Sequence, residues 1–198
     1  MALHFISTSK HKVEEFKKSL SPEVKFDQLE LNLDEIQSLD PKEVITHKLN
    51  EARKLHSGEL MVEDSSLCLD ALNGFPGPLV KHFFKSIGND GLLKIVESFN
   101  CNTVQARTMI GYFDGKEILF FEGVAKGKLV HIRRNSDFGF DPIFVPEGQN
   151  KTFSEMTREE KNLVSHRGKA LKKFKEYYLN KRALSKAKQS KNFVGPAK

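Results

Sequence analysis

Two kinds of chemical group lie close together between residues 136 and 167. The segment Phe138-Gly139-Phe140-Asp141-Pro142 offers flat aromatic faces, a glycine that permits close approach of the backbone, and one acidic acceptor. It is followed by a cluster of donors and positive charge: Lys161, Ser165, His166 and Arg167. Aromatic faces suit a flat base, and lysine and arginine suit phosphate or carbonyl oxygens. The stretch therefore predicts a nucleotide pocket.

Two adjacent acids follow a short apolar run. Leu60-Met61-Val62 is typical of a buried strand, and it leads directly into Glu63-Asp64-Ser65-Ser66. Ligands of α/β sheets collect at the carboxyl ends of strands, and Mg²⁺ prefers carboxylates together with phosphate oxygens and waters. A polar turn is the alternative interpretation. The pair Glu63-Asp64 therefore suggests a divalent-metal or general-base position, and a further acid at a predicted strand end, Glu35, favours the metal.

A possible anion site lies near the N-terminus, where Ser7-Thr8-Ser9 joins a predicted strand, Leu3 to Ile6, to a predicted helix, Lys10 to Leu20. The start of a helix presents free backbone N–H groups, and the hydroxyls and Lys12 add further donors. The alternative is an ordinary Ser/Thr cap, which the spacing alone favours.

The remaining elements follow from apolar periodicity and turn residues. We expect three more helices before residue 100, of which the first carries Lys48 and the second carries Lys81: Pro41 to Leu55, Leu79 to Ile87, and Leu92 to Phe99. We expect strands at Val24 to Leu33, Thr103 to Phe113, Glu117 to Val124, and Lys128 to Ile132. Hairpin-linked strands beside strand–helix units predict a mixed α/β (α+β) fold, not a purely parallel sheet.

The donor cluster falls at the junction of two predicted helices. Thr157 and Glu160 have the spacing of a capping box, which starts the first helix. Lys161 and Ser165 are then one turn apart on one face, and Ser165 caps the second helix. His166 and Arg167 would lie at its start, although a capping or packing role is the simpler interpretation of His166 alone.

The composition fits one domain. A chain of 198 residues can bury a sizeable core, and no apolar run approaches a membrane span. The N-terminus has neither a basic head nor a long apolar core, so we expect no secretion signal. Cys68 and Cys101 form neither a metal-spaced nor a disulfide pattern. Two reduced thiols predict a cytoplasmic protein.

The positive charge is concentrated at the C-terminus. Residues 182–198 contain five basic residues and no acid, which leaves one of the net six positive charges for residues 1–181. We therefore expect a single catalytic domain at 1–182 and a basic, disordered tail at 183–198. The nearly neutral body argues against a nucleic-acid-binding module, although the tail keeps that function open.

Several motifs together resemble the inosine triphosphate pyrophosphatase family, in its eukaryotic-type form, over roughly residues 3–179. These motifs are Val62–Leu69, Gly74–Pro78, Phe138–Pro142, Glu155-Met156, Glu160–Asn162 and Ser165–Arg167. The resemblance implies a twisted mixed sheet flanked by helices, with a nucleotide cleft between two lobes. It implies hydrolysis of ITP, dITP and XTP to monophosphate and pyrophosphate, a Mg²⁺ or Mn²⁺ cofactor, and a homodimer.

The resemblance also implies roles for individual residues. Lys12, Lys48 and Lys81 match triphosphate or cleft lysines, and Glu35 and Asp64 match the metal and water-activating acids. The base pocket would consist of Phe138, Gly139, Phe140, Asp141, Lys161, Ser165, His166 and Arg167. Two positions depart from the family: Ser7-Thr8-Ser9 replaces the usual Thr-Gly-Asn, and Phe140 replaces Trp or Tyr, so we expect Phe140 to be a packing wall.

Two alternatives stay open on these residues. The first is a related nucleotide pyrophosphatase with another substrate, such as a modified pyrimidine nucleotide. The second is a nucleotide sensor without catalysis, which the presence of Glu35 and Asp64 disfavours. We expect Asp64 to orient or deprotonate the attacking water, and donors from His166 or Arg167 to read the 6-oxygen of the base.

Overall fold

The structure is a computed structural model that describes residues 2–132 and 139–191, with side chains as far as Ala187. In chain order its elements are β1 (Leu3–Ile6), α1 (Lys10–Leu20), β2 (Asp27–Leu29), α2 (Pro41–Leu55), β3 (Glu59–Leu69), the 3₁₀ turn η1 (Asp70–Leu72), β4 (Pro76–Gly77), α3 (Val80–Ser98), β5 (Thr103–Phe113), β6 (Ile118–Leu129), β7 (Phe144–Pro146), α4 (Arg158–Val164) and α5 (His166–Lys191). None of the helices described is long and apolar enough to cross a membrane.

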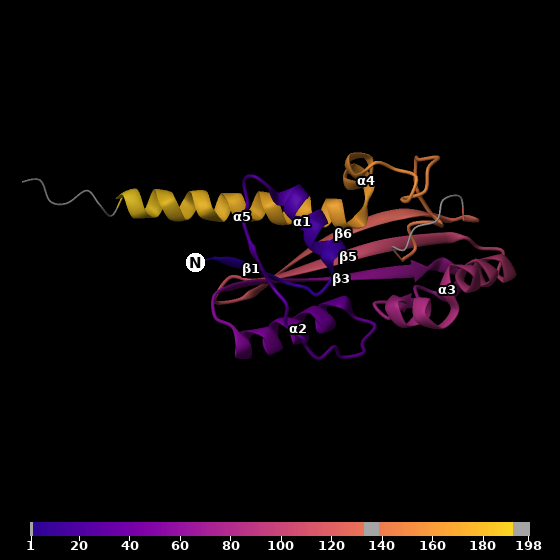
Figure 1. Cartoon of the computed structure of the whole chain (residues 1–198), viewed down its shortest axis with the longest axis horizontal. Coiled ribbons are helices and arrows are strands. Elements are labelled where there is room, and N and C mark those ends of the chain that lie inside the picture. The colour runs from indigo at the N-terminus through magenta and orange to yellow at the C-terminus, as the bar shows by residue number, and fades with distance from the viewer. Residues whose placement is uncertain (1, 133–138, 192–198) are drawn as a thin grey trace, which may run out of the picture.

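One mixed sheet of seven strands forms the centre of the molecule (Figure 1). Its order is β2-β1-β3-β5-β6-β7, and β4 pairs separately with β3. β1 runs parallel to β2 and β3, whereas β3, β5, β6 and β7 pair in antiparallel fashion. The mixed α/β fold predicted from the sequence is therefore confirmed.

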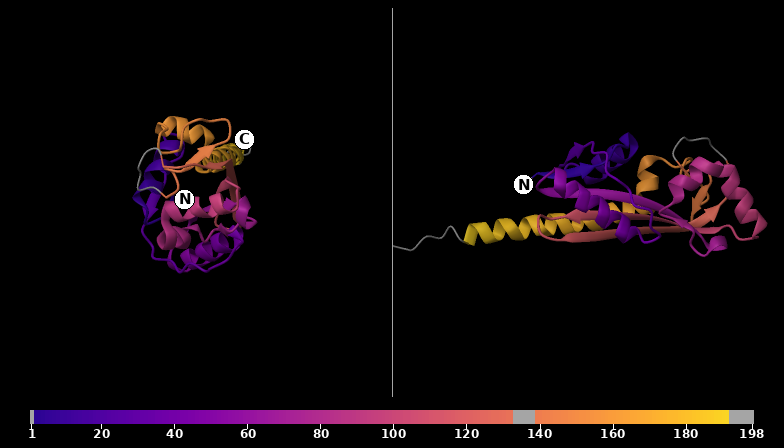
Figure 2. Two further views of the ribbon diagram at one scale, coloured as in Figure 1. Left: turned by 90° about the vertical axis from the view of Figure 1, so that its right-hand side faces the viewer. Right: turned by 90° about the horizontal axis from the view of Figure 1, so that it is seen from below.

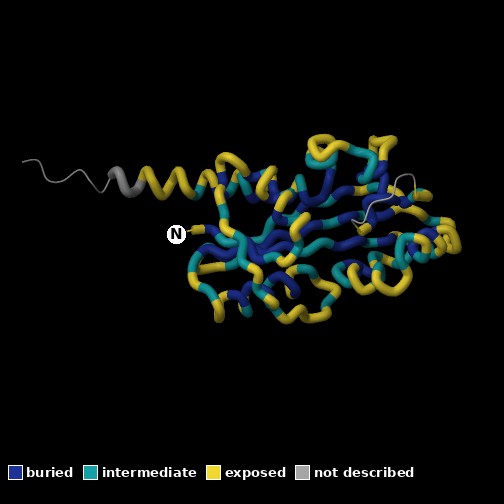
Figure 3. Tube along the Cα trace, viewed as in Figure 1, coloured by how far each residue is buried: buried dark blue, intermediate teal, exposed yellow. Residues whose placement is uncertain are grey.

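Helices cover both faces of this sheet (Figures 1 and 2). On one face, α1 and α5 pack over Phe5 and Met61; on the other, α2 packs over Leu60 and Val62. Consecutive residues of β3 thus enter opposite layers, as the alternation of side chains along a strand requires. The tube in Figure 3 shows the strands largely buried between exposed helix surfaces.

β3 is longer than expected, and the prediction that a strand ends at Val62 is wrong. The strand runs to Leu69 because β5 pairs with it in continuous register from Leu60 to Leu69. On its other edge β1 pairs only as far as Met61, and β4 pairs only at Leu67 and Cys68. Glu63 and Asp64 therefore lie inside a strand, beside an edge that no described strand covers.

Other boundaries differ for similar reasons. The predicted strand Val24 to Leu33 shortens to β2, because only Asp27–Leu29 pairs with β1, so Glu35 lies in an irregular segment. The strands predicted at Glu117 to Val124 and Lys128 to Ile132 form one strand, β6, which pairs with β5 throughout and with β7 at its end. By contrast, the break predicted between the helices Leu79 to Ile87 and Leu92 to Phe99 is confirmed, because α3 leaves the helical conformation at Gly88 (φ 63°, ψ −169°).

The last helix, α5, continues to Lys191. Residues 183–191 are therefore helical, whereas the sequence predicts disorder from residue 183. Its final turns extend past the sheet and are exposed as far as they are described (Figure 3). The division into a catalytic domain at 1–182 and a tail at 183–198 stays a prediction.

The start of α5 lies directly against β6, and two glycines permit this contact. A Cβ on Gly123 of β6 would clash with the carbonyl oxygen of His166 and the backbone nitrogen of Ala170. A Cβ on Gly168 would clash with the carbonyl oxygen of Asn162, at the end of α4. The close backbone contacts at these two glycines determine where the α4–α5 junction lies over the sheet.

Candidate functional site

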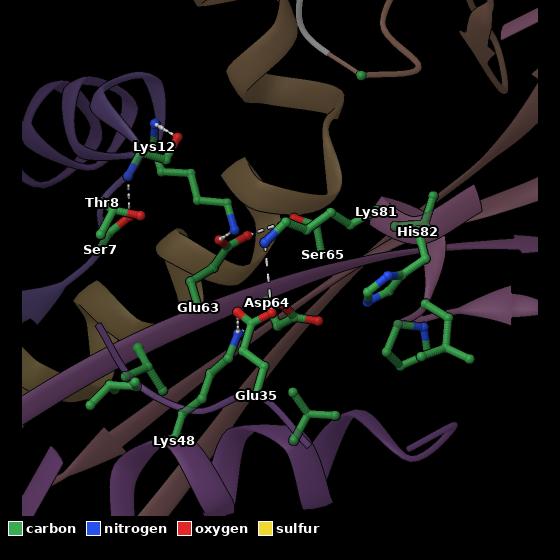
Figure 4. Close-up of a pocket in the computed structure, with 18 of the residues that line it drawn as sticks. Ser7, Thr8, Lys12, Glu35, Lys48, Glu63, Asp64, Ser65, Lys81 and His82 are labelled. Atoms are coloured by element: carbon green, nitrogen blue, oxygen red, sulfur yellow. Dashed lines mark hydrogen bonds and ion pairs between the residues drawn. The ribbon is translucent and has the colours of Figure 1, made fainter. Parts of the chain in front are cut away.

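A cleft of about 780 Å³ opens beside the uncovered edge of β3 (Figure 4). Its walls come from the β1–α1 junction, the 31–38 segment, α2, β3, the start of α3, residues 139–141 and the start of α5. Twelve of the predicted site residues line it: Ser7, Ser9, Lys12, Glu35, Lys48, Asp64, Lys81, Gly139, Phe140, Asp141, His166 and Arg167. Lys161 and Ser165 do not line it, and Phe138 lies outside the described residues.

Glu35 and Asp64 meet at a shared lysine. The Nζ atom of the buried Lys48 is 2.7 Å from Glu35 Oε1 and 3.2 Å from Asp64 Oδ1. Burial raises the pKa of Asp64 above its usual value, although Lys48 opposes that rise. At Glu35 the balance is reversed: burial alone would raise the pKa, but the hydrogen bond and charge of Lys48 lower it. Asp64 is thus the more basic of the two carboxylates.

The predicted metal ligands have the chemistry for a divalent cation. Among residues 2–132 and 139–191 there is no group of three or more His, Cys, Asp or Glu side chains that could hold a metal ion. Mg²⁺ is, however, commonly held by one or two carboxylates with phosphate oxygens and waters. The Lys48 ammonium already lies between Glu35 and Asp64, which shows that this pair accommodates a positive charge.

Glu63 belongs to the acid pair noted in the sequence, but it was not among the predicted site residues. Its side chain is 0% exposed, and its Oε2 atom is 2.6 Å from Lys12 Nζ. Arg167 Nη2 donates to its Oε1 atom at 3.1 Å, and Ser65 Oγ donates to the same atom at 2.7 Å. Burial alone would raise the pKa of Glu63, but Arg167 and Lys12 hold it far below the usual range. Glu63 and Asp64 are consecutive residues of β3, so their side chains point to opposite faces of the sheet. This alternation is the sequence signal that could have distinguished the roles of the two acids.

The predicted donor cluster is assembled at the α4–α5 junction. The capping box of Thr157 and Glu160 is present, and Ser165 Oγ accepts from the backbone N–H of Gly168 at 3.0 Å, so Ser165 caps α5. Lys161 Nζ lies 2.6 Å from Asp141 Oδ2 and 3.3 Å from Glu15 Oε1. Glu15, on α1, is a second functional candidate that the sequence reasoning missed.

His166 is buried among aromatic rings. Its ring centroid lies 5.6 Å from that of Phe140 and 5.9 Å from that of Phe153. Burial, together with the neighbouring Arg167 charge, lowers the pKa of His166 well below its usual value. The imidazole is therefore neutral near pH 7, and its Nδ1 atom has no hydrogen-bond partner among residues 2–132 and 139–191. Phe140, 7% exposed, packs against His166 as a wall.

Residues 3–177 match the family model described as the Ham1 family. The chain belongs to the Ham1 family. An inosine triphosphate pyrophosphatase from Aspergillus oryzae is 40% identical over 182 residues, which are 91% of this chain and 95% of that protein. A dITP/XTP pyrophosphatase from Thermococcus kodakarensis is 40% identical over 176 residues, 88% of this chain and 95% of that protein.

A solved structure supports the same fold for this Ham1-family chain. The HAM1 protein from Coxiella burnetii superposes with a TM-score of 0.79, covering 91% of this chain and 100% of that one at 24% identity. Similarity at that level of identity concerns the arrangement of helices and strands. The side-chain roles must be argued from the cleft itself.

The buried imidazole predicts a pH dependence of stability in this Ham1-family chain. An unfolded histidine titrates at a pKa of about 6.5, whereas burial holds the pKa of His166 well below that value. As the pH falls below about 6.5, the unfolded chain binds a proton that the folded chain does not. His166 therefore lowers the free energy of unfolding by up to about 1.4 kcal/mol per pH unit.

Urea unfolding at pH 7.5 and pH 5.5 measures this contribution. We expect His166→Gln to lose less stability than the parent chain between the two pH values. His131→Gln is the matched control, since the His131 side chain is 87% exposed. Equal losses in the parent and His166→Gln would show that His166 is not buried in neutral form.

Proposed function

We propose that this chain hydrolyses noncanonical purine nucleoside triphosphates (ITP, dITP and XTP) to nucleoside monophosphate and pyrophosphate. Relatives named for these activities match most of the chain at 40% identity. The observation that carries the proposal is the layout of the cleft. Lysines and carboxylates gather around Lys48, and an aromatic wall and a neutral imidazole gather around Phe140 and His166. We take these two groups as the two ends of the cleft.

The lysine-rich end suits a triphosphate. Lys12, Lys48 and Lys81 bring positive charge to the cleft beside Ser7 and the start of α1. The first-turn N–H groups of a helix attract anions, and Ser9 is the N-cap, its Oγ accepting from Lys12 N at 3.4 Å. The cap uses an acceptor position of the Ser9 hydroxyl, so its O–H can still donate to a phosphate oxygen, directly or through water.

We assign the water-activating role to Asp64. The reaction needs a water that attacks the α-phosphorus in line while pyrophosphate leaves. A carboxylate whose pKa is raised by burial accepts a proton more readily than an ordinary aspartate. Glu35 and Asp64 would also hold Mg²⁺ or Mn²⁺, which when bound neutralises phosphate charge and lowers the pKa of water.

The other end of the cleft suits a purine with an oxygen at position 6. Hypoxanthine and xanthine present an acceptor there, whereas adenine presents an amino donor. A protein donor from His166 or Arg167 would match the acceptor and oppose adenine, and an unmatched buried donor costs about 1–3 kcal/mol. Guanine also carries the 6-oxygen, so its exclusion depends on the 2-amino group. The homodimer remains a proposal that the family resemblance suggests, and the cytoplasmic location remains one that the two reduced thiols suggest.

Pyrophosphate release from a panel of nucleotides tests the function. We expect kcat/KM for ITP, dITP and XTP to exceed that for ATP and GTP by about 100-fold or more, as sites that require a hydrogen bond can achieve. Removal of Mg²⁺ with a chelator should abolish turnover. Comparable rates on all five nucleotides, or release of orthophosphate in place of pyrophosphate, would contradict the proposal.

A further inference from the structure

Six charged side chains form a continuous row along the wall of the cleft, and four of them line it: Lys12, Glu63, Arg167 and Asp141. In order they are Lys12, Glu63, Arg167, Glu15, Lys161 and Asp141, and each forms an ion pair with the next. The row joins α1, β3, α5, α4 and the 139–141 segment. Its two terminal residues, Lys12 and Asp141, both line the cleft, whereas the central Glu15 does not.

The distances along this row alternate. The first, third and fifth pairs are short: 2.6 Å for Lys12–Glu63, 2.5 Å for Arg167–Glu15 and 2.6 Å for Lys161–Asp141. The second and fourth pairs are longer: 3.1 Å for Glu63–Arg167 and 3.3 Å for Glu15–Lys161. Each of the four interior side chains therefore has one near and one farther partner of opposite charge.

The alternation defines a second pairing of the same six groups. If every interior side chain favours its farther partner, Glu63 pairs with Arg167 and Glu15 pairs with Lys161. That exchange leaves two groups without a partner in the row, and they are the terminal ones. Lys12 becomes available to a phosphate, and Asp141 becomes available to a donor on a base edge, such as a ring N–H.

We propose that this row couples the two ends of the cleft, so that an anion bound at Lys12 strengthens binding of a purine base at Asp141, and the reverse. The inference rests on the proposed function and names the residue that links its two halves. Glu15 is the positioning residue at the centre of the row, because it is ion-paired with both Arg167 and Lys161 and can shift from one partner to the other.

Burial makes the exchange concerted. The side chain of Glu63 is 0% exposed, that of Arg167 is 5% exposed, and that of Lys161 is 12% exposed. A buried charge that loses its partner without replacement is strongly destabilised. A phosphate that draws Lys12 away therefore favours a closer Glu63–Arg167 pair, which weakens the hold of Arg167 on Glu15. Opposite charges attract more strongly as they approach, so the effect passes to Lys161 and Asp141.

Two separate probes can measure this coupling: inosine, which has no phosphate, and inorganic pyrophosphate, which has no base. Ligand-observed NMR gives the Kd of inosine with and without saturating pyrophosphate, at constant Mg²⁺. We expect pyrophosphate to lower the Kd of inosine by about fivefold or more, and inosine to lower the Kd of pyrophosphate by the same factor, since coupling is reciprocal.

Glu15→Gln retains the shape of the side chain and removes its charge. In this variant we expect the coupling factor to fall below about twofold. Glu14→Gln is the matched control, because Glu14 is exposed and is paired with Arg158 at 3.7 Å, outside the row. It should retain the coupling of the parent chain.

An inosine Kd that is the same with and without pyrophosphate in the parent chain would overturn the coupling, and so would full coupling in Glu15→Gln. The coupling would also be overturned if inosine did not bind even in the presence of saturating pyrophosphate. Hydrolysis of ITP without coupling would leave the proposed function standing. Coupled probes without ITP hydrolysis would overturn the proposed function alone.

Discussion

Asp64→Asn is expected to lower kcat for ITP by about 10²- to 10⁴-fold, the range associated with a positioned proton acceptor. The amide preserves the shape of the carboxylate but cannot accept a proton from water, and it removes one of the two negative charges around Lys48. Nucleotide binding should stay measurable, because Lys12 and Lys81 still line the cleft. Pyrophosphate release and the Kd of an inosine nucleotide separate the two effects.

Asp70→Asn provides the matched control for this change. Asp70 belongs to η1, just beyond the end of β3, and is exposed outside the cleft. Its variant should retain the turnover of the parent chain. Near-normal pyrophosphate release by Asp64→Asn would remove Asp64 from the chemistry.

Glu63→Gln is expected to lower the free energy of unfolding by about 3–5 kcal/mol, the usual cost of removing one partner from a buried ion pair. Lys12 and Arg167 would both lose the charge that they share. The loss is largest near neutral pH, since Glu63, whose pKa is held far below the usual range, is ionised there in the folded chain. Urea unfolding at pH 7.5 measures the change.

Glu97→Gln is the matched control for the free energy of unfolding of Glu63→Gln. Glu97 is 54% exposed and is paired only with the exposed His131, at 3.4 Å, in the ion pairs described, so its loss should cost about 0.5 kcal/mol or less. A similarly small loss in Glu63→Gln would show that the buried carboxylate is not required to hold Lys12 and Arg167.

Local sequence signals predicted the elements that depend on local interactions. The capping box at Thr157, the cap at Ser165 and the strand Thr103 to Phe113 are all present as expected. Each depends on residues within one turn of helix or on a regular alternation along one strand. Twelve of the predicted site residues also line the cleft.

Features set by distant parts of the chain were missed. β3 continues past Val62 because β5, some forty residues further along, pairs with it, and no local signal shows that pairing. Glu15 likewise becomes a site candidate, and Glu63 is shown to be an ion-pair partner of Arg167, only when α1, β3 and α5 are brought together. An acidic residue on a helix is usually solvated, so nothing in the sequence around Glu15 distinguished it from Glu14.

The close contact between α5 and β6 has a consequence for altering the substrate range of this protein. Gly123 and Gly168 carry no reactive group, yet any side chain at either position would lift the helix start that holds His166 and Arg167. A library that seeks new base preferences should therefore leave these two glycines untouched, and it should replace the buried Phe140 only by side chains of similar volume. In such a selection, two positions without any reactive group would be restricted alongside those that contact the nucleotide.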